Sequence, residues 1–504
     1  MDRAEQLATG AVYLTLGQAA SYVATFLFYV AVARVLSQSE VGSLSILLMS
    51  IGVFNTLTML ALNSAVIRFV SEGLGRGDEE YAAAASKKAL KIILAASTPA
   101  LALMSLMSPR IAAYINTGVF EVIAILVSAF ILDMTSYCGA VMYGFRLFKE
   151  VAIQNTLYII LSRFLGIVLA LIGFRLLGLS IGFLLGSLIT LLYSAWIIKG
   201  LAKPVDRSFP ASKLWSFSRP IYGANIIQLL QSWLDLGVLS TVVGLGAAGA
   251  YYIAVSSTTA LSILWVPLSS ALFPTLSFIN GSGDRAQTLE VSERALRIIT
   301  ALILPISFAA AAVSTTALTL VYGVGYAEAS IPFSILAAST TLTAYTAVYQ
   351  AETQAVGLTK PIFTAGATST AAYLTLLATI TPLLGQIGAA ISRAAMITTS
   401  YIILHKAVGL KTPSNLKRSV AAAILTASTL APIELLLHVN TLLKVLIEAS
   451  TLIAVLLLSY KLLKPLNSEE AALLKTFIQN IVRRRVDKPK PSHNNNQTSA
   501  QRPQ

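Results

Sequence analysis

Charged residues and cysteine are both scarce in this sequence of 504 residues. Only 12% of the residues are charged, whereas 56% are hydrophobic. A soluble globule of this length needs more ionisable side chains to cover its surface, so the composition excludes an ordinary soluble protein. The single cysteine, Cys138, excludes an intramolecular disulfide and a metal cluster built from thiolates. His405, His438 and His493 have no partner at metal-ligand spacing, so we expect no metal site and no cofactor.

Long apolar runs recur along the chain. About 20 residues, each rising about 1.5 Å along a helix, cross a hydrocarbon core of about 30 Å. Backbone groups in lipid must find their hydrogen-bond partners within the helix, so these runs predict an all-α polytopic membrane protein of about 14 transmembrane helices. The expected helices cover residues 10–35, 41–66, 89–108, 119–144, 151–174, 177–198, 220–243, 247–279, 297–320, 329–355, 361–381, 386–407, 419–438 and 441–463.

Lysine and arginine residues gather in every second connection between the expected helices. The intervening connections hold only Arg110 and Arg175. Because basic loops stay in the cytoplasm, both termini are expected there, with the chain crossing the cell membrane many times. This placement accounts for the net charge of +14, so nucleic acid is not an expected partner, whereas membrane lipids are. The basic connections carry Arg68, Arg76, Lys87, Lys88 and Lys91; Arg146 and Lys149; Lys199, Lys203, Arg207, Lys213 and Arg219; Arg285, Arg294 and Arg297; Lys360; and Lys406, Lys411, Lys417 and Arg418.

An internal repeat relates residues 75–99 to residues 281–305. Shared apolar composition does not explain aligned Gly, Asp and Pro residues, and two units of six helices have the same orientation in the membrane. The identical pairs are Gly75/Gly281, Gly77/Gly283, Asp78/Asp284, Ser86/Ser292, Ala89/Ala295, Leu90/Leu296, Ile92/Ile298, Ile93/Ile299, Ala95/Ala301 and Pro99/Pro305. The expected organisation is a cytoplasmic stub (1–9), an N-terminal six-helix bundle (10–198), a cytoplasmic linker (199–219), a C-terminal six-helix bundle (220–408), an additional helix pair (419–464), an interfacial amphipathic helix (465–487) and a disordered tail (488–504).

Polar side chains form a stripe on the helix expected at 220–243. Asn225, Gln228, Ser232 and Asp235 follow one face at helical spacing. Two parallel bundles can rock about a central seam and expose a midplane site to either side, and polar residues in apolar helices mark such a seam. We predict that this stripe and its counterpart on the first helix bind substrate. The counterpart consists of Gln18, Ser21 and Thr25. The alternative is that these groups only bond neighbouring helices.

Several charges lie inside or near the ends of the apolar runs. Arg34, Arg163 and Arg393 are candidate ligands for an anionic head group such as a diphosphate, because guanidinium forks match phosphate oxygens. Asp235 and Asp133 are candidates for binding a coupling proton or sodium ion. Ion pairing within a bundle is the alternative for all of these charges, including a pair between Asp235 and an arginine. Snorkelling to the interface is a further alternative for Arg34 and for Glu352.

Four stretches resemble the polysaccharide and O-antigen flippases of the multidrug/oligosaccharidyl-lipid/polysaccharide exporter superfamily. They are Ala33–Leu36 continuing to Glu40–Gly42; Ile67–Phe69 with the loop through Asp78; Phe217–Pro220 with Trp233–Asp235 and Gly249–Tyr251; and Leu384–Ala390. The resemblance covers about residues 10–408. It implies transport of an oligosaccharide linked to undecaprenyl or dolichyl diphosphate to the outer leaflet, with glycan-assembly enzymes as candidate partners.

Two other functions remain open at this stage. A cation-coupled exporter of drugs or metabolites from the same superfamily is one, although the helix pair after Leu410 is more typical of the lipid-linked class. A polyprenyl-dependent glycosyltransferase or polymerase is the other. Such an enzyme needs large outer loops, and outer connections such as Ser37–Glu40 are short. We therefore expect a transporter and no enzymatic site.

Overall fold

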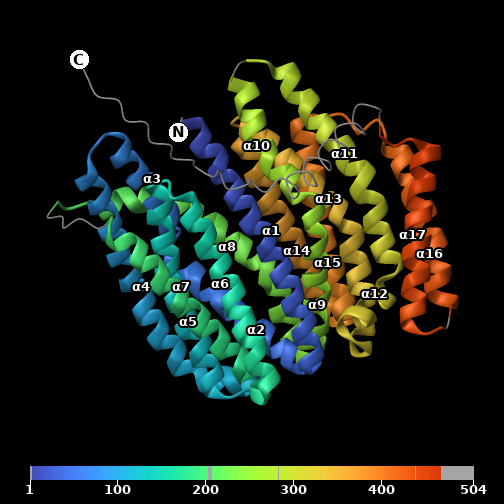
Figure 1. The fold of residues 1–504 in the computed structure, drawn as a ribbon, viewed down its shortest axis with the longest axis horizontal. Helices are drawn as coiled ribbons and strands as arrows, with labels where there is room; N and C mark the ends of the chain where they lie inside the picture. The colour runs from blue at the N-terminus through green and yellow to red at the C-terminus, as the bar shows by residue number, and fades with distance from the viewer. Residues whose placement is uncertain (1–2, 202–206, 282, 438, 467–504) are drawn as a thin grey trace, which may run out of the picture.

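The computed structural model describes residues 3–201, 207–281, 283–437 and 439–466, and every regular element within these ranges is helical (Figure 1). The elements are α1 (Arg3–Val35), α2 (Gln38–Met59), α3 (Leu62–Gly75), α4 (Glu79–Tyr114), α5 (Val119–Gly144), α6 (Phe148–Leu169), η1 (Ala170–Phe174), α7 (Arg175–Lys199), α8 (Ala211–Val242), α9 (Leu245–Leu261), η2 (Ser262–Leu264), α10 (Val266–Gly281), α11 (Arg285–Ala312), α12 (Ser314–Tyr322), η3 (Val324–Ala329), α13 (Ser330–Ala355), α14 (Thr359–Leu384), α15 (Gln386–Val408), α16 (Leu416–Leu436) and α17 (Thr441–Leu463). From residue 467 onward, the expected amphipathic helix and tail lie outside the described residues.

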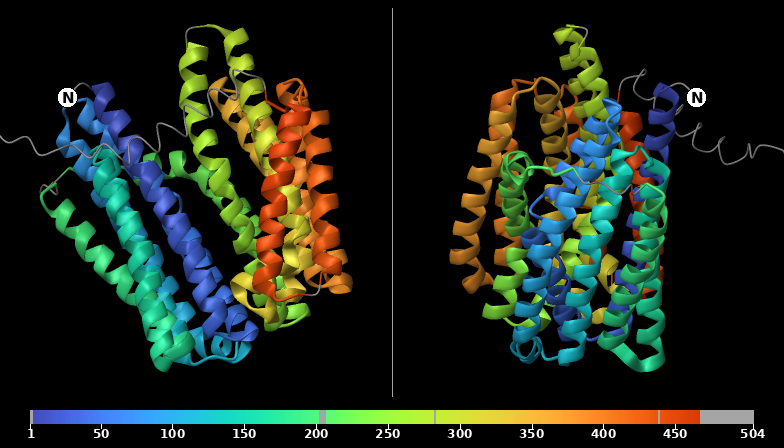
Figure 2. Two further views of the ribbon diagram at one scale, coloured as in Figure 1. Left: turned by 45° about the vertical axis from the view of Figure 1, so that its right-hand side comes forward. Right: turned by 90° about the vertical axis from the view of Figure 1, so that its left-hand side faces the viewer.

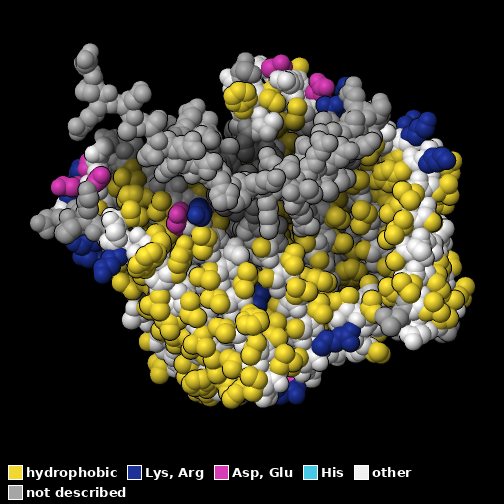
Figure 3. All heavy atoms as spheres, in the orientation of Figure 1, with side chains coloured by type: hydrophobic (Ala, Val, Ile, Leu, Met, Phe, Trp, Pro, Cys, Tyr) yellow, Lys and Arg dark blue, Asp and Glu magenta, His cyan; other side chains and the backbone are white. Residues whose placement is uncertain are grey.

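The chain is a multi-pass membrane protein. Among the described residues, 11 helical segments are long and apolar enough to cross a bilayer. One of them, Phe148–Lys199, contains both α6 and α7. Large hydrophobic side chains such as Leu106 and Trp196 are exposed, and hydrophobic side chains cover much of the face in Figure 3. Such a surface is suited to lipid and not to water.

Three of the expected helices are divided in the structure. The run at 41–66 breaks between α2 and α3, where Leu60 and Ala61 both have positive φ. Neither glycine nor proline marks this break, so the apolar pattern predicted one continuous helix, which is wrong. The run at 247–279 is interrupted by η2, and that at 297–320 divides at Val313 into α11 and α12. The other expected helices each lie on one observed element or two adjoining ones.

The two copies of the repeated segment have the same local structure. Gly77 and Gly283 both have positive φ, of 72° and 83°, which glycine adopts without strain. Asp78 and Asp284 then cap α4 and α11, each accepting a hydrogen bond of 2.9 Å from the backbone N–H three residues later. That bond, together with the Arg207 guanidinium at 2.7 Å, holds the pKa of Asp78 below its ordinary value. Both helices therefore begin well before the apolar runs that predicted them.

Small residues bring α6 and α7 into close contact. Gly178, Gly182 and Gly186 recur every fourth residue on α7, and a Cβ at Gly182 would lie 2.3 Å from the Cα of Gly166 on α6. In lipid, the hydrophobic effect does not drive helices together. They associate instead through close packing of small residues. The backbones of α6 and α7 are therefore in direct contact along this face.

The helices form two groups that meet at one end, the first made of α1 to α7 and the second of α9 to α17, while α8 lies between them and packs on α2 and on α9. In Figure 2 the ribbons of the two groups diverge toward the end that carries the N-terminus. At the opposite end, a Cβ at Gly42 of α2 would lie 1.9 Å from the carbonyl oxygen of Leu245 of α9. The hydroxyls of Tyr29 and Tyr252 are 2.5 Å apart at this end as well. We call this set of contacts between the groups the closed junction.

Candidate functional site

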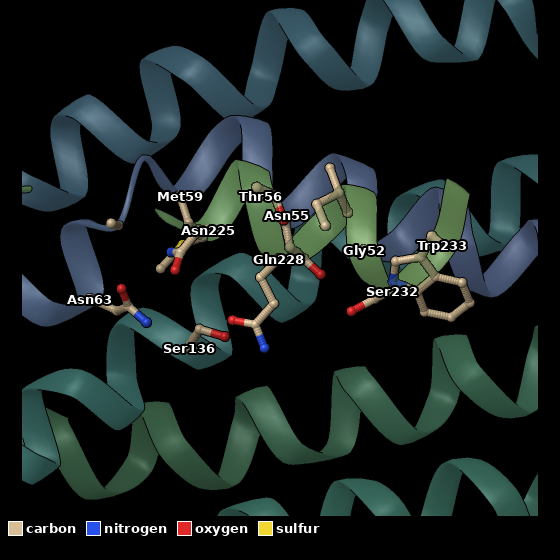
Figure 4. Close-up of a pocket in the computed structure, with 12 residues that line it drawn as sticks. Gly52, Asn55, Thr56, Met59, Asn63, Ser136, Asn225, Gln228, Ser232 and Trp233 are labelled. Atoms are coloured by element: carbon tan, nitrogen blue, oxygen red, sulfur yellow. The ribbon is translucent and has the colours of Figure 1, made fainter. Parts of the chain in front are cut away.

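Polar side chains line a cavity of about 310 Å³ between α8 and helices α2, α3 and α5 of the first group. Figure 4 shows Gln228 of α8 and Ser136 of α5 directed into the same space, with Asn63 of α3 beside them. The lining residues are Gly52, Asn55, Thr56, Met59, Ala61, Asn63, Ser136, Asn225, Gln228, Leu229, Ser232 and Trp233. None of these lining residues is ionisable. The cavity therefore offers amide and hydroxyl groups, which both donate and accept hydrogen bonds, but no charge.

The structure places Asn225, Gln228 and Ser232 of the expected stripe in this lining, on consecutive turns of α8. The polar stripe explains why α8 is not among the segments apolar enough to be identified as a span. Asn55, Asn63 and Ser136 were missed by the sequence interpretation. A signal existed for Asn55, since an amide side chain interrupts the apolar helix α2.

An aromatic side chain closes one end of the cavity. Trp233 lies over Gly52, where a Cβ would come within 3.0 Å of the indole Nε1. Its ring stacks on Tyr252, with ring centroids 6.3 Å apart and planes inclined by 25°. Tyr252 belongs to the closed junction, so the cavity ends where the two helix groups meet.

Asp235, the last member of the stripe, is fully buried and forms an ion pair with Arg393 of α15. An oxygen of the carboxylate lies 2.7 Å from Nη2 and 2.8 Å from Nε of Arg393. Tyr251 donates a hydrogen bond to the same carboxylate oxygen at 2.7 Å, and Arg393 also donates to the carbonyl of Ser232 at 3.2 Å. Of the two alternatives for Asp235, the observed contact is the arginine pair. Arg393 also borders a second cavity, of about 160 Å³, between α9, α13 and α15.

Asp133 of α5 is also fully buried, but its contacts are neutral. Asn55 donates to one carboxylate oxygen at 2.5 Å. Thr58 and Ser97 donate to the other at 2.5 Å and 2.6 Å. No described residue pairs with Asp133 as a cation. Because Asn55 also lines the cavity, one side chain connects this carboxylate to the polar space.

The remaining predicted arginines lie away from the cavity lining. Arg163 of α6 stacks over the ring of Phe28 of α1, with its guanidinium carbon 5.6 Å from the ring centroid. Arg34, at the end of α1, donates hydrogen bonds to the carbonyls of Leu320 and Val321, the last turn of α12. Glu352, the other candidate for snorkelling, is buried and pairs with Arg285 at 2.5 Å. Thus Arg34 bridges the two helix groups at the closed junction, whereas Glu352 is neutralised within the second group.

The polar residues of α1 do not meet the stripe of α8. Ser21 and Thr25 donate to carbonyl groups one turn earlier in their own helix, at 2.8 Å and 2.7 Å. Gly17, one turn before Ser21, packs on α6, since its Cβ would lie 2.9 Å from the hydroxyl oxygen of Thr156. Gln18 is exposed. Among the described residues, the cavity therefore has a polar stripe from α8 without a matching stripe from α1.

Comparison with known proteins places the chain among membrane transporters. A family model described as "Polysaccharide biosynthesis protein" matches residues 31–331, which is more than half of the chain. A solved structure of the lipid II flippase MurJ in an inward closed conformation is similar, with a TM-score of 0.72 and 14% identity over 89% of this chain and 99% of that one. Among curated proteins, no sequence matches the chain at a significant level.

Two further solved structures have the same fold. One is an inward-facing multidrug resistance MATE family transporter of the MOP superfamily, with a TM-score of 0.61 and 14% identity over 79% of this chain and 98% of that one. The other is a MOP superfamily transporter from Pyrococcus furiosus, with a TM-score of 0.56 and 14% identity over 80% of this chain and 96% of that one. At this level of identity, the likeness establishes the fold alone.

Proposed function

The chain belongs to the polysaccharide biosynthesis protein family, as its motifs predicted, and from this premise we propose that it transports a lipid-linked oligosaccharide across the cytoplasmic membrane. The lipid carrier is of the polyprenyl or dolichyl diphosphate type. The observation that carries this proposal is the uncharged polar lining of the cavity along α8. Amides and hydroxyls suit sugar hydroxyls, whereas a cationic drug needs a carboxylate in the lining.

Alternating access is the mechanism that the arrangement of helices supports best. We assign 14 transmembrane helices to the chain, as two parallel six-helix bundles (10–198 and 220–408) and a C-terminal pair. With both termini in the cytoplasm, the closed junction lies on the outer side and the helix groups diverge on the inner side. The sugar would then enter from the cytoplasm and leave when the junction opens.

The diphosphate is assigned to the arginines. In the conformation described, Arg393 is held by Asp235, so the anion must compete with this carboxylate. Exchange of one anionic partner for another keeps the guanidinium neutralised throughout, which matters in a site of low dielectric. Arg163 has a buried Nε that donates to no described residue, and no described carboxylate competes with an anion for it. Arg34 would act at the outer end, where it bridges the helix groups.

Coupling to an ion is assigned first to Asp133. Its carboxylate is buried among three neutral donors and lies one side chain from the cavity, so a proton or sodium ion can neutralise it. Asp235 already has a cationic partner in Arg393. Binding of an ion at Asp235 therefore requires that Arg393 leaves first.

Complementation of a flippase-deficient strain tests the proposal. The intact chain should restore glycan export, and Gln228→Ala should reduce it, while the exposed Thr241→Ala on the same helix should not. The gene product must reach the membrane in each case, as judged by immunoblotting. Failure of the intact chain to restore export, together with resistance of cells to cationic drugs, would favour the exporter instead.

A further inference from the structure

The C-terminal helix pair holds one end of α12. Glu434 of α16 accepts a hydrogen bond of 2.8 Å from the backbone N–H of Thr316, in the first turn of α12, and another from the hydroxyl of Thr316. The other end of α12 receives the hydrogen bonds of Arg34 from the first helix group. The short helix α12 thus connects the C-terminal pair to the closed junction.

A second carboxyl group faces Glu434. Glu448 of α17 is 5% exposed and lies one helical turn after Lys444, whose ammonium is 3.2 Å from the carboxylate of Glu434, so the two carboxyl groups are neighbours. Its Oε1 is buried and accepts no hydrogen bond from any described residue. Two carboxylate oxygens cannot bond to one another without a proton, because both are acceptors. A hydrogen bond between the two groups would therefore need a proton on one of them.

The local charges also balance only when one proton is present. Lys444 lies 3.2 Å from Glu434 and donates to its backbone carbonyl at 2.7 Å. On α12 the pair meets Thr316, and residues 304–312 at the end of α11 carry no ionisable side chain. With both glutamates ionised, two negative charges would face one positive charge in an apolar segment; with one proton, the group is neutral.

We propose that Glu434 and Glu448 form a proton-binding site that controls how the C-terminal helix pair holds α12 at the closed junction. The proton is carried by Glu448 and donated in a hydrogen bond to Glu434. Its release leaves a second carboxylate beside Glu434, and the two repel one another. The cap on α12 then weakens, and with it the contact of α12 with Arg34. Lys444 already occupies the place of a cation, which disfavours a sodium ion.

Infrared difference spectroscopy on the full chain in lipid nanodiscs detects the proton directly. A protonated carboxyl gives its own C=O stretching band, and part of that band should disappear in Glu448→Gln and return in Glu448→Asp. Glu328→Gln, an exposed carboxylate on η3 at the same end, is the matched control and should leave the band unchanged. If Glu448→Gln folds normally and removes no part of the band, Glu448 carries no proton and the proposal is wrong.

Spin-label distances across the junction detect the consequence. Labels on Val119→Cys and Val324→Cys, both exposed, in a Cys138→Ala background report the separation of the helix groups. Raising the pH should lengthen this distance over the same range in which the Glu448 band is lost, while Glu448→Gln should keep the short distance. A His438→Gln background excludes titration of the histidine four positions after Glu434 in the sequence. Control of α12 by a proton would be refuted if the spin-label distance stays unchanged when the band is lost. It would also be refuted if the distance changes with sodium concentration at constant pH. Neither the infrared nor the spin-label measurement depends on the cargo, so both test this proposal independently of the proposed function.

Discussion

Gly42 of α2 and Gly249 of α9 pack back to back, so that a Cβ at Gly249 would lie 2.7 Å from the backbone nitrogen of Gly42. This contact joins the two helix groups, and no side chain fits between them. It defines the end of the molecule at which a transported molecule cannot pass in this conformation. The polar cavity lies on the side of this contact where the helix groups diverge, with Trp233 and Tyr252 between.

Substitution of either glycine should weaken the junction. Gly42→Ala and Gly249→Ala should each lower the free energy of unfolding in detergent by about 1–3 kcal/mol, since a methyl group must displace backbone. Gly246→Ala is the matched control, because nothing lies within 4 Å of a Cβ at that position. If Gly42→Ala and Gly249→Ala unfold at the same midpoint as Gly246→Ala, the contact between the two glycines does not stabilise the junction.

Removal of Arg393 should affect stability as well as transport. Arg393→Ala leaves Asp235 as an unpaired buried charge, and we expect a loss of about 3–5 kcal/mol of unfolding free energy. The double variant Asp235→Asn/Arg393→Ala should recover most of that loss, because no isolated charge remains. Thermal unfolding of the purified proteins measures both.

Transport by that double variant decides what the arginine does. If Arg393 binds the diphosphate, the double variant should be stable but inactive. Full transport by the double variant would assign Arg393 a purely structural role, as the partner of Asp235.

The sequence predicted where most of the helices lie, but not the breaks within three of them, and it predicted one side of the cavity. Period and polarity placed Asn225, Gln228 and Ser232 on one face of α8, and that face lines the cavity. The same argument predicted that Ser21 and Thr25 line the cavity, but their side chains bond to their own helix. A polar face that bonds its own backbone and packs on a neighbouring helix has the same period as one that lines a cavity.

The sequence alone could not predict which distant segments contact one another. The pair formed by Asp235 and Arg393 joins residues 158 positions apart, and only the packing of α8 on α15 decides between it and an ion site. The break at Leu60–Ala61 is likewise set by tertiary packing, since neither residue favours positive φ.

Asp133 should set the ion dependence of transport. Asp133→Asn removes the only charge of that cluster and keeps the shape of the side chain, although its amide oxygen can accept only the bonds made to one of the two carboxylate oxygens, so transport should lose its dependence on pH or on sodium. Asp78→Asn, which changes a half-buried helix cap away from that cluster, should keep that dependence. Initial rates measured across pH and sodium concentrations compare the two; an unchanged ion dependence in Asp133→Asn would move the coupling site elsewhere.

Access to the cavity should come from the cytoplasmic side. In a Cys138→Ala background, Gln228→Cys should react with a membrane-impermeant thiol reagent in inside-out vesicles and react much more slowly in right-side-out vesicles. Leu236→Cys, buried on the same helix, should remain unlabelled in both. Faster labelling of Gln228→Cys from outside would reverse the proposed orientation of the closed junction.

Transport in a defined system tests the central claim most directly. The purified chain in proteoliposomes should move a fluorescent lipid-linked oligosaccharide between leaflets, as measured by access of a membrane-impermeant quencher. It should move the same lipid without its sugar several-fold more slowly, and it should not accumulate a cationic dye. Dye accumulation without movement of the glycolipid would contradict the account and identify a drug exporter on the same fold.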